Sequence, residues 1–193
     1  MTQNLENHLP VVMSDGLNTQ KAVSFGSTLA VTGATTISST LAVTGATTLS
    51  GAVTQKSNVV SGSGATVTLT AAQSGSTVLF DRAAGIIYTL PAPVVGLWFE
   101  FIITVSITSN NAKIITDAGT TLLIGQVYNA VAAGTGTTFI ANGSTHIACT
   151  QNGTTTGGLI GTSLLVSCVS ATLWEVAGTV LGSGTIATPF ATS

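Results

Sequence analysis

The spacing of apolar residues divides this chain into three stretches. Residues 1–25 show no hydrophobic period, whereas short alternating runs fill 26–56 and longer ones continue from 65 to 193. Alternation of apolar and polar residues with a period of two is typical of a β-strand with one buried face. No stretch combines a 3.6-residue period with helix caps. The pattern therefore predicts an all-β protein.

An internal repeat occupies the second stretch. The nine residues TLAVTGATT at 28–36 recur unchanged at 40–48, and a partial third copy, GAVT, follows at 51–54. In the first unit Leu29 and Val31 share one face, and Gly33 then interrupts the alternation. We expect each unit to form two very short strands joined by a turn.

Such a unit has one apolar row and nothing of its own to cover it. Repeat arrays solve this problem by stacking, usually with at least three units of about 20–45 residues. Here barely three units of 12 residues are present. We therefore expect the segment 26–56 to wrap with other copies of the chain as a short intertwined trimeric β-stalk. A flexible Gly/Ser linker is the alternative, but such linkers lack a regular apolar period.

The third stretch predicts a separate head domain. Residues 57–64, which include Ser-Gly-Ser-Gly at 61–64, form a predicted joint, and 65–193 contain about ten short strands. This arrangement is typical of an antiparallel β-sandwich or jelly-roll-like head. In the longest alternating segment one face is expected to carry Phe99, Phe101, Ile103, Val105 and Ile107. The candidate strands are 66–70, 76–80, 85–90, 97–108, 112–116, 121–126, 137–141, 145–150, 163–169 and 173–176.

Turn-forming pairs lie between these strands. Asn110-Asn111, Asn142-Gly143 and Asn152-Gly153 are predicted to be hairpin turns, because type I′ turns need residues that tolerate positive φ. Leu-Pro-Ala-Pro at 90–93 must be extended and cannot lie in a central ladder. It is expected to close one strand and begin a crossover.

Composition narrows the classes of function. Charged residues make up 5% of the chain, hydrophobic residues 45%, and the mean hydropathy is +0.59. Four Lys and Arg residues cannot neutralise a row of phosphates, so nucleic-acid binding is not expected. The apolar stretches 97–107 and 159–169 are shorter than the roughly 18 residues of a membrane helix. Without a recognisable secretory signal, we expect synthesis in a cytoplasm and burial of the excess apolar surface between subunits.

The sequence predicts no catalytic, cofactor-binding or metal-binding residue. The carboxylates are dispersed, so a glycosidase-type pair such as Asp117 with Glu175 would need a tertiary contact. Asp81-Arg82 is expected to form a loop ion pair or to cap a turn. His8 and His146 lack nearby metal-ligand partners, although a three-fold assembly would bring three copies of one residue to its axis. Nucleophile-elbow, Walker and dinucleotide-binding motifs are absent from the sequence.

The remaining polar motifs also have structural explanations. Cys149 and Cys168 lie in apolar runs and are expected to be buried small residues, with a disulfide or a reactive thiol as the alternatives. The sequons at 142–144 and 152–154 are expected to be turns and not glycosylation sites. The loop at 154–158 is either mobile or a contact loop.

Several of these segments together resemble virion proteins of tailed bacteriophages. They are the tandem LAVTGATT units, AAQSG at 71–75, DRAAG at 81–85, TLPAP at 89–93, and the closing GSGT at 182–185 with Pro-Phe at 189–190. The resemblance spans about residues 15–193. It implies a trimeric, non-enzymatic particle component with a thin stalk and a β-rich head, and it carries over no catalytic residue.

The favoured function is a homotrimeric capsid decoration (cement) or head-fibre protein located in the virion. In this hypothesis residues 1–25 form an arm that docks on the major capsid protein or another virion protein. One alternative is a tail-fibre or tail-tip protein that contacts host surface glycans. Another is an enzyme such as a depolymerase, which the dispersed carboxylates disfavour.

Overall fold

The computed structural model describes residues 30–38, 41–53, 56–62, 64–131 and 134–193. The chain divides into two units, Met1–Ala52 and Val53–Ser193. The arm expected at 1–25, with His8, lies outside the described residues.

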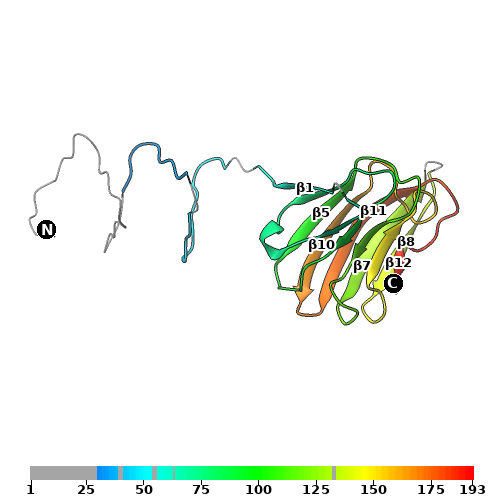
Figure 1. Ribbon diagram of the computed structural model, residues 1–193. Helices are drawn as coiled ribbons and strands as arrows, with labels where there is room; N and C mark the ends of the chain where they lie inside the picture. Colours follow the sequence, from blue (N-terminus) through cyan, green and yellow to red (C-terminus); the bar gives the residue numbers. More distant parts are fainter. Residues whose placement is uncertain (1–29, 39–40, 54–55, 63, 132–133) are drawn as a thin grey trace, which may run out of the picture. The chain divides into compact units, whose positions relative to one another are not determined.

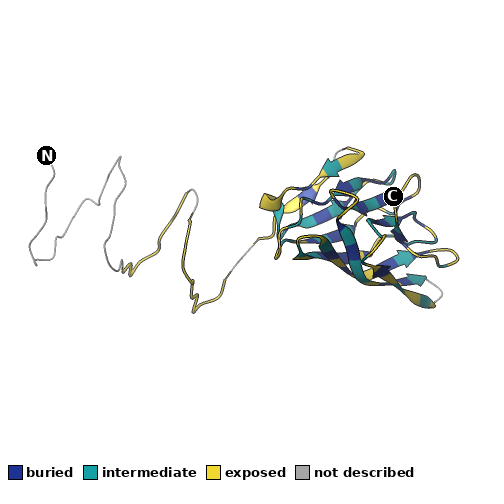
Figure 2. Ribbon diagram, turned by 90° about the horizontal axis from the view of Figure 1, so that it is seen from below, coloured by how far each residue is buried: buried dark blue, intermediate teal, exposed yellow. Residues whose placement is uncertain are grey.

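The described part of the first unit contains no β-strand, and all of its residues are exposed, as are those of the following segment to residue 53 (Figure 2). The short strands expected in each repeat unit are therefore not formed in the single chain. Two strands of a few residues cannot support each other in water without a third element to cover them. This lack of cover was expected from the short length of the repeat units.

The second unit consists of two β-sheets (Figure 1). Every one of the ten predicted strands has a counterpart, and the two short strands β1 and β12 are additional. The seven-stranded sheet has the order β1 (Val59–Ser61), β3 (Thr77–Phe80), β5 (Trp98–Ile103), β10 (Ser163–Ser170), β11 (Leu173–Gly182), β7 (Leu122–Val131) and β8 (Gly136–Asn142). The five-stranded sheet has the order β12 (Phe190–Ala191), β9 (Ala148–Gln151), β6 (Ala112–Ile115), β4 (Ile87–Thr89) and β2 (Thr66–Thr68).

The expectation of an antiparallel sandwich is wrong, because both sheets are mixed. Strands β1 to β6 alternate between the two sheets, and successive members of each sheet, β1-β3-β5 and β2-β4-β6, pair in parallel. Parallel neighbours need a crossover connection. Here the strand in the opposite sheet supplies the crossover, so the first half of the head is wound as a coil. Alternation of apolar and polar residues gives a strand one inward and one outward face whether its neighbours are parallel or antiparallel. The pattern therefore cannot distinguish parallel from antiparallel pairing.

The predicted hairpin turns are also corrected. All three Asn sites lie at corners where the chain passes from one sheet to the other, after β5, β8 and β9. Type I′ geometry is excluded at both Asn-Gly pairs, because only Gly143 and Gly153 have positive φ there. The hairpins that form join β7 to β8 and β10 to β11. The prediction for 90–93 is confirmed, because this segment leads from β4 to β5 in the other sheet.

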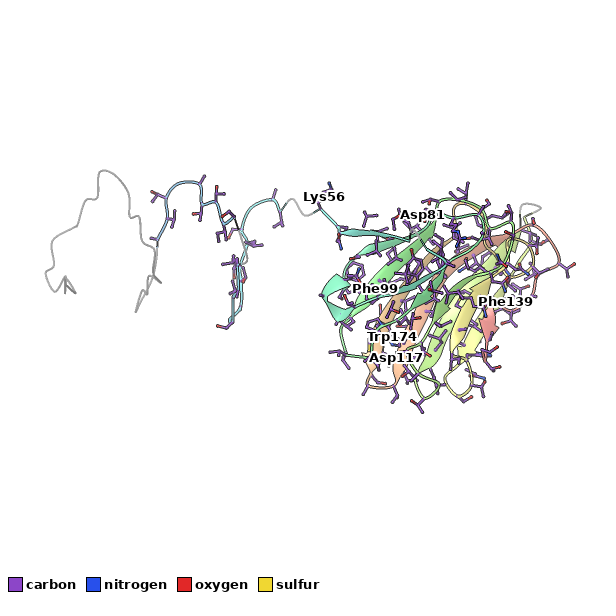
Figure 3. The ribbon with its side chains drawn as sticks, viewed as in Figure 1. Lys56, Asp81, Phe99, Asp117, Phe139 and Trp174 are labelled. Atoms are coloured by element: carbon purple, nitrogen blue, oxygen red, sulfur yellow. The ribbon has the colours of Figure 1, made fainter. Side chains whose placement is uncertain are left out.

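Aromatic residues form the centre of the core between the sheets. Phe99 and Phe101 are buried on β5 as predicted, and Phe99 packs on Trp174 of β11 with 6.1 Å between ring centroids (Figure 3). Val105, expected on the same face, is exposed because β5 ends at Ile103. Residues 57–64, the predicted joint, contain β1, whose Val60 is buried in this core. Among the described residues no helix is long and apolar enough to cross a membrane.

Candidate interaction surface

The outer face of the seven-stranded sheet displays side chains of low polarity. Strand register places Val59, Thr77, Glu100 and Leu165 side by side in one row across β1, β3, β5 and β10. Of the described outward positions on this sheet, two are charged, Glu100 and Glu175, and both are acidic. The exposed large apolar or aromatic residues on the strands of this face are Val59, Trp98, Tyr128, Ile140, Leu165 and Val169.

A hollow of about 450 Å³ lies over β5 and β10 at one end of this face. It is lined by Gly96, Leu97, Trp98, Leu165, Ser167 and Cys168. Its volume falls within the range of about 300–1,000 Å³ found for binding pockets. The main-chain N–H of Cys168 donates to the Leu97 carbonyl at 2.8 Å, and the N–H of Gly96 donates to the Cys168 carbonyl at 3.1 Å. These hydrogen bonds fix the loop before β5 against the end of β10.

Trp98 lines the hollow, and contacts with Ser74 and Gly75 hold it in place. The main-chain N–H of Trp98 donates to the Ser74 hydroxyl at 3.1 Å, and its main-chain carbonyl accepts from the N–H of Gly75 at 2.8 Å. A Cβ on Gly75 would lie 3.5 Å from the indole ring, so the ring packs over this glycine. Trp98 was not among the residues predicted from the sequence to be functional. The signal was present, because Trp98 occupies the outward phase of an alternating strand whose other phase is Phe99 and Phe101.

Trp98 and Leu165 line the hollow, and three further exposed apolar residues lie close to its lining residues in the sequence. We call this group the Trp98 patch; its five residues are between 41% and 67% exposed and none is charged. Contiguous exposed apolar surface of this kind marks interaction sites in soluble proteins. The members of the patch are Val94, Val95, Trp98, Leu165 and Val169.

The predicted carboxylate pair does not lie in the hollow. Asp117 is exposed in the loop after β6, and Glu175 is exposed on β11, where its Cγ lies close to Gly125. Neither residue lines the hollow. The structure thus gives the two carboxylates no shared cleft in the described part of the chain.

Asp81 and Arg82 contribute to a turn. The Ser61 hydroxyl donates to the Asp81 carboxylate, which ties the end of β1 to the end of β3. The N–H of Gly85 donates to the Arg82 carbonyl at 3.0 Å and closes the turn. The expected ion pair does not appear among the hydrogen bonds and contacts of the described residues.

The loops that follow the two Asn-Gly pairs share one hydrogen-bond pattern. In each, the Asn Oδ1 accepts the main-chain N–H two and four residues later, and its Nδ2 donates to the threonine hydroxyl three residues later. The main-chain N–H of the Asn donates to the side chain four residues later, His146 Nδ1 after Asn142 and Thr156 Oγ1 after Asn152. The His146 ring also stacks on Phe190. His146 is therefore part of a corner that fixes the chain direction.

The loop at 154–158 is held by contacts from inside the head. Asn129, which is fully buried, donates to the Thr155 carbonyl at 2.9 Å, and Ser183 N donates to the Thr154 carbonyl at 3.0 Å. The Gly158 carbonyl accepts from Ile107 N at 2.9 Å. These hydrogen bonds tie the loop to the head, and the two alternatives from the sequence, a mobile loop and a contact loop, stay predictions.

Both cysteines are free and buried on strands, as predicted, and the disulfide alternative is excluded. Burial raises the pKa of the Cys149 thiol to about 12, and burial also raises the pKa of Cys168 above its ordinary value. Both thiols are therefore protonated at neutral pH and are weak nucleophiles. The Cys168 side chain belongs to the buried core, in the same phase of β10 as Leu164 and Val166.

Metal ligands are not gathered in the described residues, where no group of three or more His, Cys, Asp or Glu could hold an ion.

Comparison with protein-family models, curated proteins and solved structures found no match to this chain.

Proposed function

We propose that this chain is a structural protein of a bacteriophage particle, acting as a homotrimeric capsid decoration or head-fibre protein held through residues 1–25. The observation that carries the proposal is the repeat, whose apolar side chains have no cover in the single chain. These side chains are 49–67% exposed. They are Val31, Ile37, Leu41, Val43, Leu49 and Val53.

Burial energetics support self-association of the repeat. Covering one large aliphatic side chain contributes about 1.5–3 kcal/mol. Equivalent residues recur 12 positions apart, as Val31 and Val43 do, so copies of the same segment offer each other matching apolar rows. Three chains wrapped about an axis would cover all of these rows together. The assignment to a phage particle is supported by the sequence resemblance of the repeat and of the segments at 71–75, 81–85 and 89–93.

The first test is the mass of the full chain in solution. We expect native mass spectrometry and light scattering to give three times 19.2 kDa. A stable monomer at micromolar concentration would overturn the stalk. The second test locates the protein on intact particles by gold labelling of a C-terminal tag. Label distributed over the head is expected, and label confined to the tail tip would overturn the capsid assignment.

A tail-fibre or tail-tip protein that contacts host glycans is the second candidate. The observation in its favour is Tyr128, an exposed aromatic residue that lies beside Thr138 on the outer face of the seven-stranded sheet. Aromatic rings next to hydroxyl groups suit sugar rings. Tyr128→Ala would then reduce host adsorption, whereas the capsid proposal expects adsorption to be unchanged.

A further inference from the structure

We propose that the Trp98 patch is the contact through which the heads of neighbouring copies pack against each other. This inference rests on the proposed homotrimer and names the surface that the head contributes to it. It differs from the stalk proposal because the patch belongs to the second unit, which forms its own core without the repeat.

The position of the patch supports a second copy as the occupant. Strands β1, β3 and β5 are parallel and begin at the same end of the sheet, and the antiparallel β10 ends there (Figure 1). Val59 of β1 and Glu100 of β5 lie in the same row of the sheet, because each pairs with Thr77 of β3. Since these strands are parallel, Trp98 lies in the same row as residue 57, where the chain enters the head. Two strand spacings, about 10 Å, separate these positions across the sheet.

The connection to the repeat is short. Five residues separate Val53, the last apolar residue of the repeat, from Val59 at the start of β1, and an extended chain covers at most about 3.5 Å per residue. Three repeats that meet at an axis would therefore hold three β1 strands within about 20 Å of that axis. The entry end of each head, with its Trp98 patch, is then the part nearest to the other two copies.

The shape of the patch suits a three-fold contact. Leu97 N donates to the Val94 carbonyl at 3.1 Å, and this turn, with Gly96 at φ +95°, places Val95 at its exposed corner. The hollow lies directly beside this turn, because Gly96 and Leu97 form part of its lining. One copy thus offers a projecting side chain and an adjacent cavity. A ring of three needs such a contact between two different surfaces, whereas a two-fold dimer needs one self-complementary surface.

Charge also favours an identical copy over a charged partner. The five patch residues carry no charge, so bringing patches together creates no like-charge pair at the centre of the contact. The nearest outward carboxylate, Glu100, accepts a hydrogen bond from the Thr77 hydroxyl at 3.3 Å. A basic or acidic partner would find no opposite charge within the patch.

The two tryptophans make the proposal measurable in the full chain. Trp174 is fully buried in the core, whereas Trp98 is 43% exposed in the single chain. We expect both to be shielded from acrylamide quenching in the assembled protein. Trp98→Phe isolates the Trp174 signal and allows the Trp98 contribution to be obtained by difference.

A pair of charge substitutions provides the matched comparison. Leu165→Glu places a charge in the patch, and Ile140→Glu places one on the same face of the sheet at the far edge, where Ile140 is 68% exposed. We expect loss of Trp98 shielding with Leu165→Glu and none with Ile140→Glu. Circular dichroism of both variants shows whether the head is folded. Val95→Asp repeats the measurement of Trp98 shielding at an exposed turn residue, where a charge does not disturb the fold of the head.

The outcomes separate the two proposals. A protein of three times 19.2 kDa in which Trp98 is freely quenched would overturn the patch and leave the trimer standing. A monomer would overturn both. Equal effects of Leu165→Glu and Ile140→Glu on Trp98 shielding would also overturn the patch.

Discussion

The rings of Phe80 and Tyr88 meet edge to face, with 5.0 Å between their centroids and 78° between their planes. Phe80 ends β3 in the seven-stranded sheet, and Tyr88 is the middle residue of β4 in the five-stranded sheet. The Tyr88 hydroxyl crosses the core and donates to the Leu79 carbonyl at 2.7 Å. One residue thus joins the two sheets by ring packing and by a hydrogen bond.

Tyr88→Phe should lower the free energy of unfolding by about 1–2 kcal/mol, because the Leu79 carbonyl loses its buried donor. The ring contact with Phe80 is kept. Chemical denaturation of the full chain at fixed protein concentration measures the change. Tyr128→Phe, at an exposed position on the other sheet, is the matched control and should change stability by less than about 0.5 kcal/mol. Equal effects of the two substitutions would contradict the assigned role of the hydroxyl.

Stability should fall at alkaline pH because of the same residue. Burial, and to a smaller extent the Asp81 carboxylate, raise the pKa of Tyr88 from 10.0 to about 12. Between these values the native protein holds a proton that the unfolded chain releases, so the stability present below pH 10 is lost as the pH rises towards 12. Unfolding free energies of wild type and Tyr88→Phe should therefore converge over this interval. A constant difference from pH 9 to 12 would refute the prediction.

Gly153→Ala should be strongly destabilising. Gly153 has φ +80°, and a Cβ there would lie 1.9 Å from the Ile107 carbonyl oxygen. Both the backbone conformation and the overlap act against alanine, and we expect a loss of at least about 2 kcal/mol. Gly119→Ala is the control, because a Cβ at Gly119 meets nothing within 4 Å. Thermal unfolding of the two variants should differ by several degrees in Tm.

The Asn152 side chain should be needed for the corner after β9. Its Oδ1 accepts the main-chain N–H groups of Thr154 and Thr156 at 2.9 and 3.1 Å. Asn152→Ala removes these acceptors and should cost about 1–3 kcal/mol. Asn152→Asp keeps an acceptor oxygen and should restore most of the stability. If the alanine and aspartate variants unfold at the same denaturant concentration, the hydrogen bonds accepted by the Asn152 side chain do not stabilise the corner.

Charges on the apolar phase of the repeat should disrupt assembly and spare the head. Leu41→Asp with Val43→Asp places two charges where the proposal buries side chains, so the mass should fall from three chains to one. Thr44→Asp lies on the other phase of the same unit and should leave the mass unchanged. Light scattering measures the mass, and circular dichroism checks that the head is folded. A trimer that survives the double substitution would contradict the intertwined repeat.

The apolar and polar pattern determined that the head is built of strands and which side chains face inward within a strand, but not where a strand ends, as exposed Val105 after β5 shows. The alternation at Phe99, Phe101 and Ile103 is sufficient for this, because burial of one face depends only on local periodicity. The repeat likewise followed from sequence identity alone. Its exposed apolar rows in the single chain agree with the reasoning that one copy cannot cover them.

Tertiary structure decided how the strands pair and which outward residues gather. The parallel pairing within β1 to β6 depends on which strand the chain places next to the previous one after each corner. The Asn-Gly pairs form corners between the sheets, although their local preference is for hairpin turns. The same winding brings Trp98 on β5 next to Leu165 on β10, residues that are far apart in the sequence. The sequence alone established the apolar composition and the repeat. The grouping of exposed apolar residues on the head depends on long-range strand register, which no local pattern encodes.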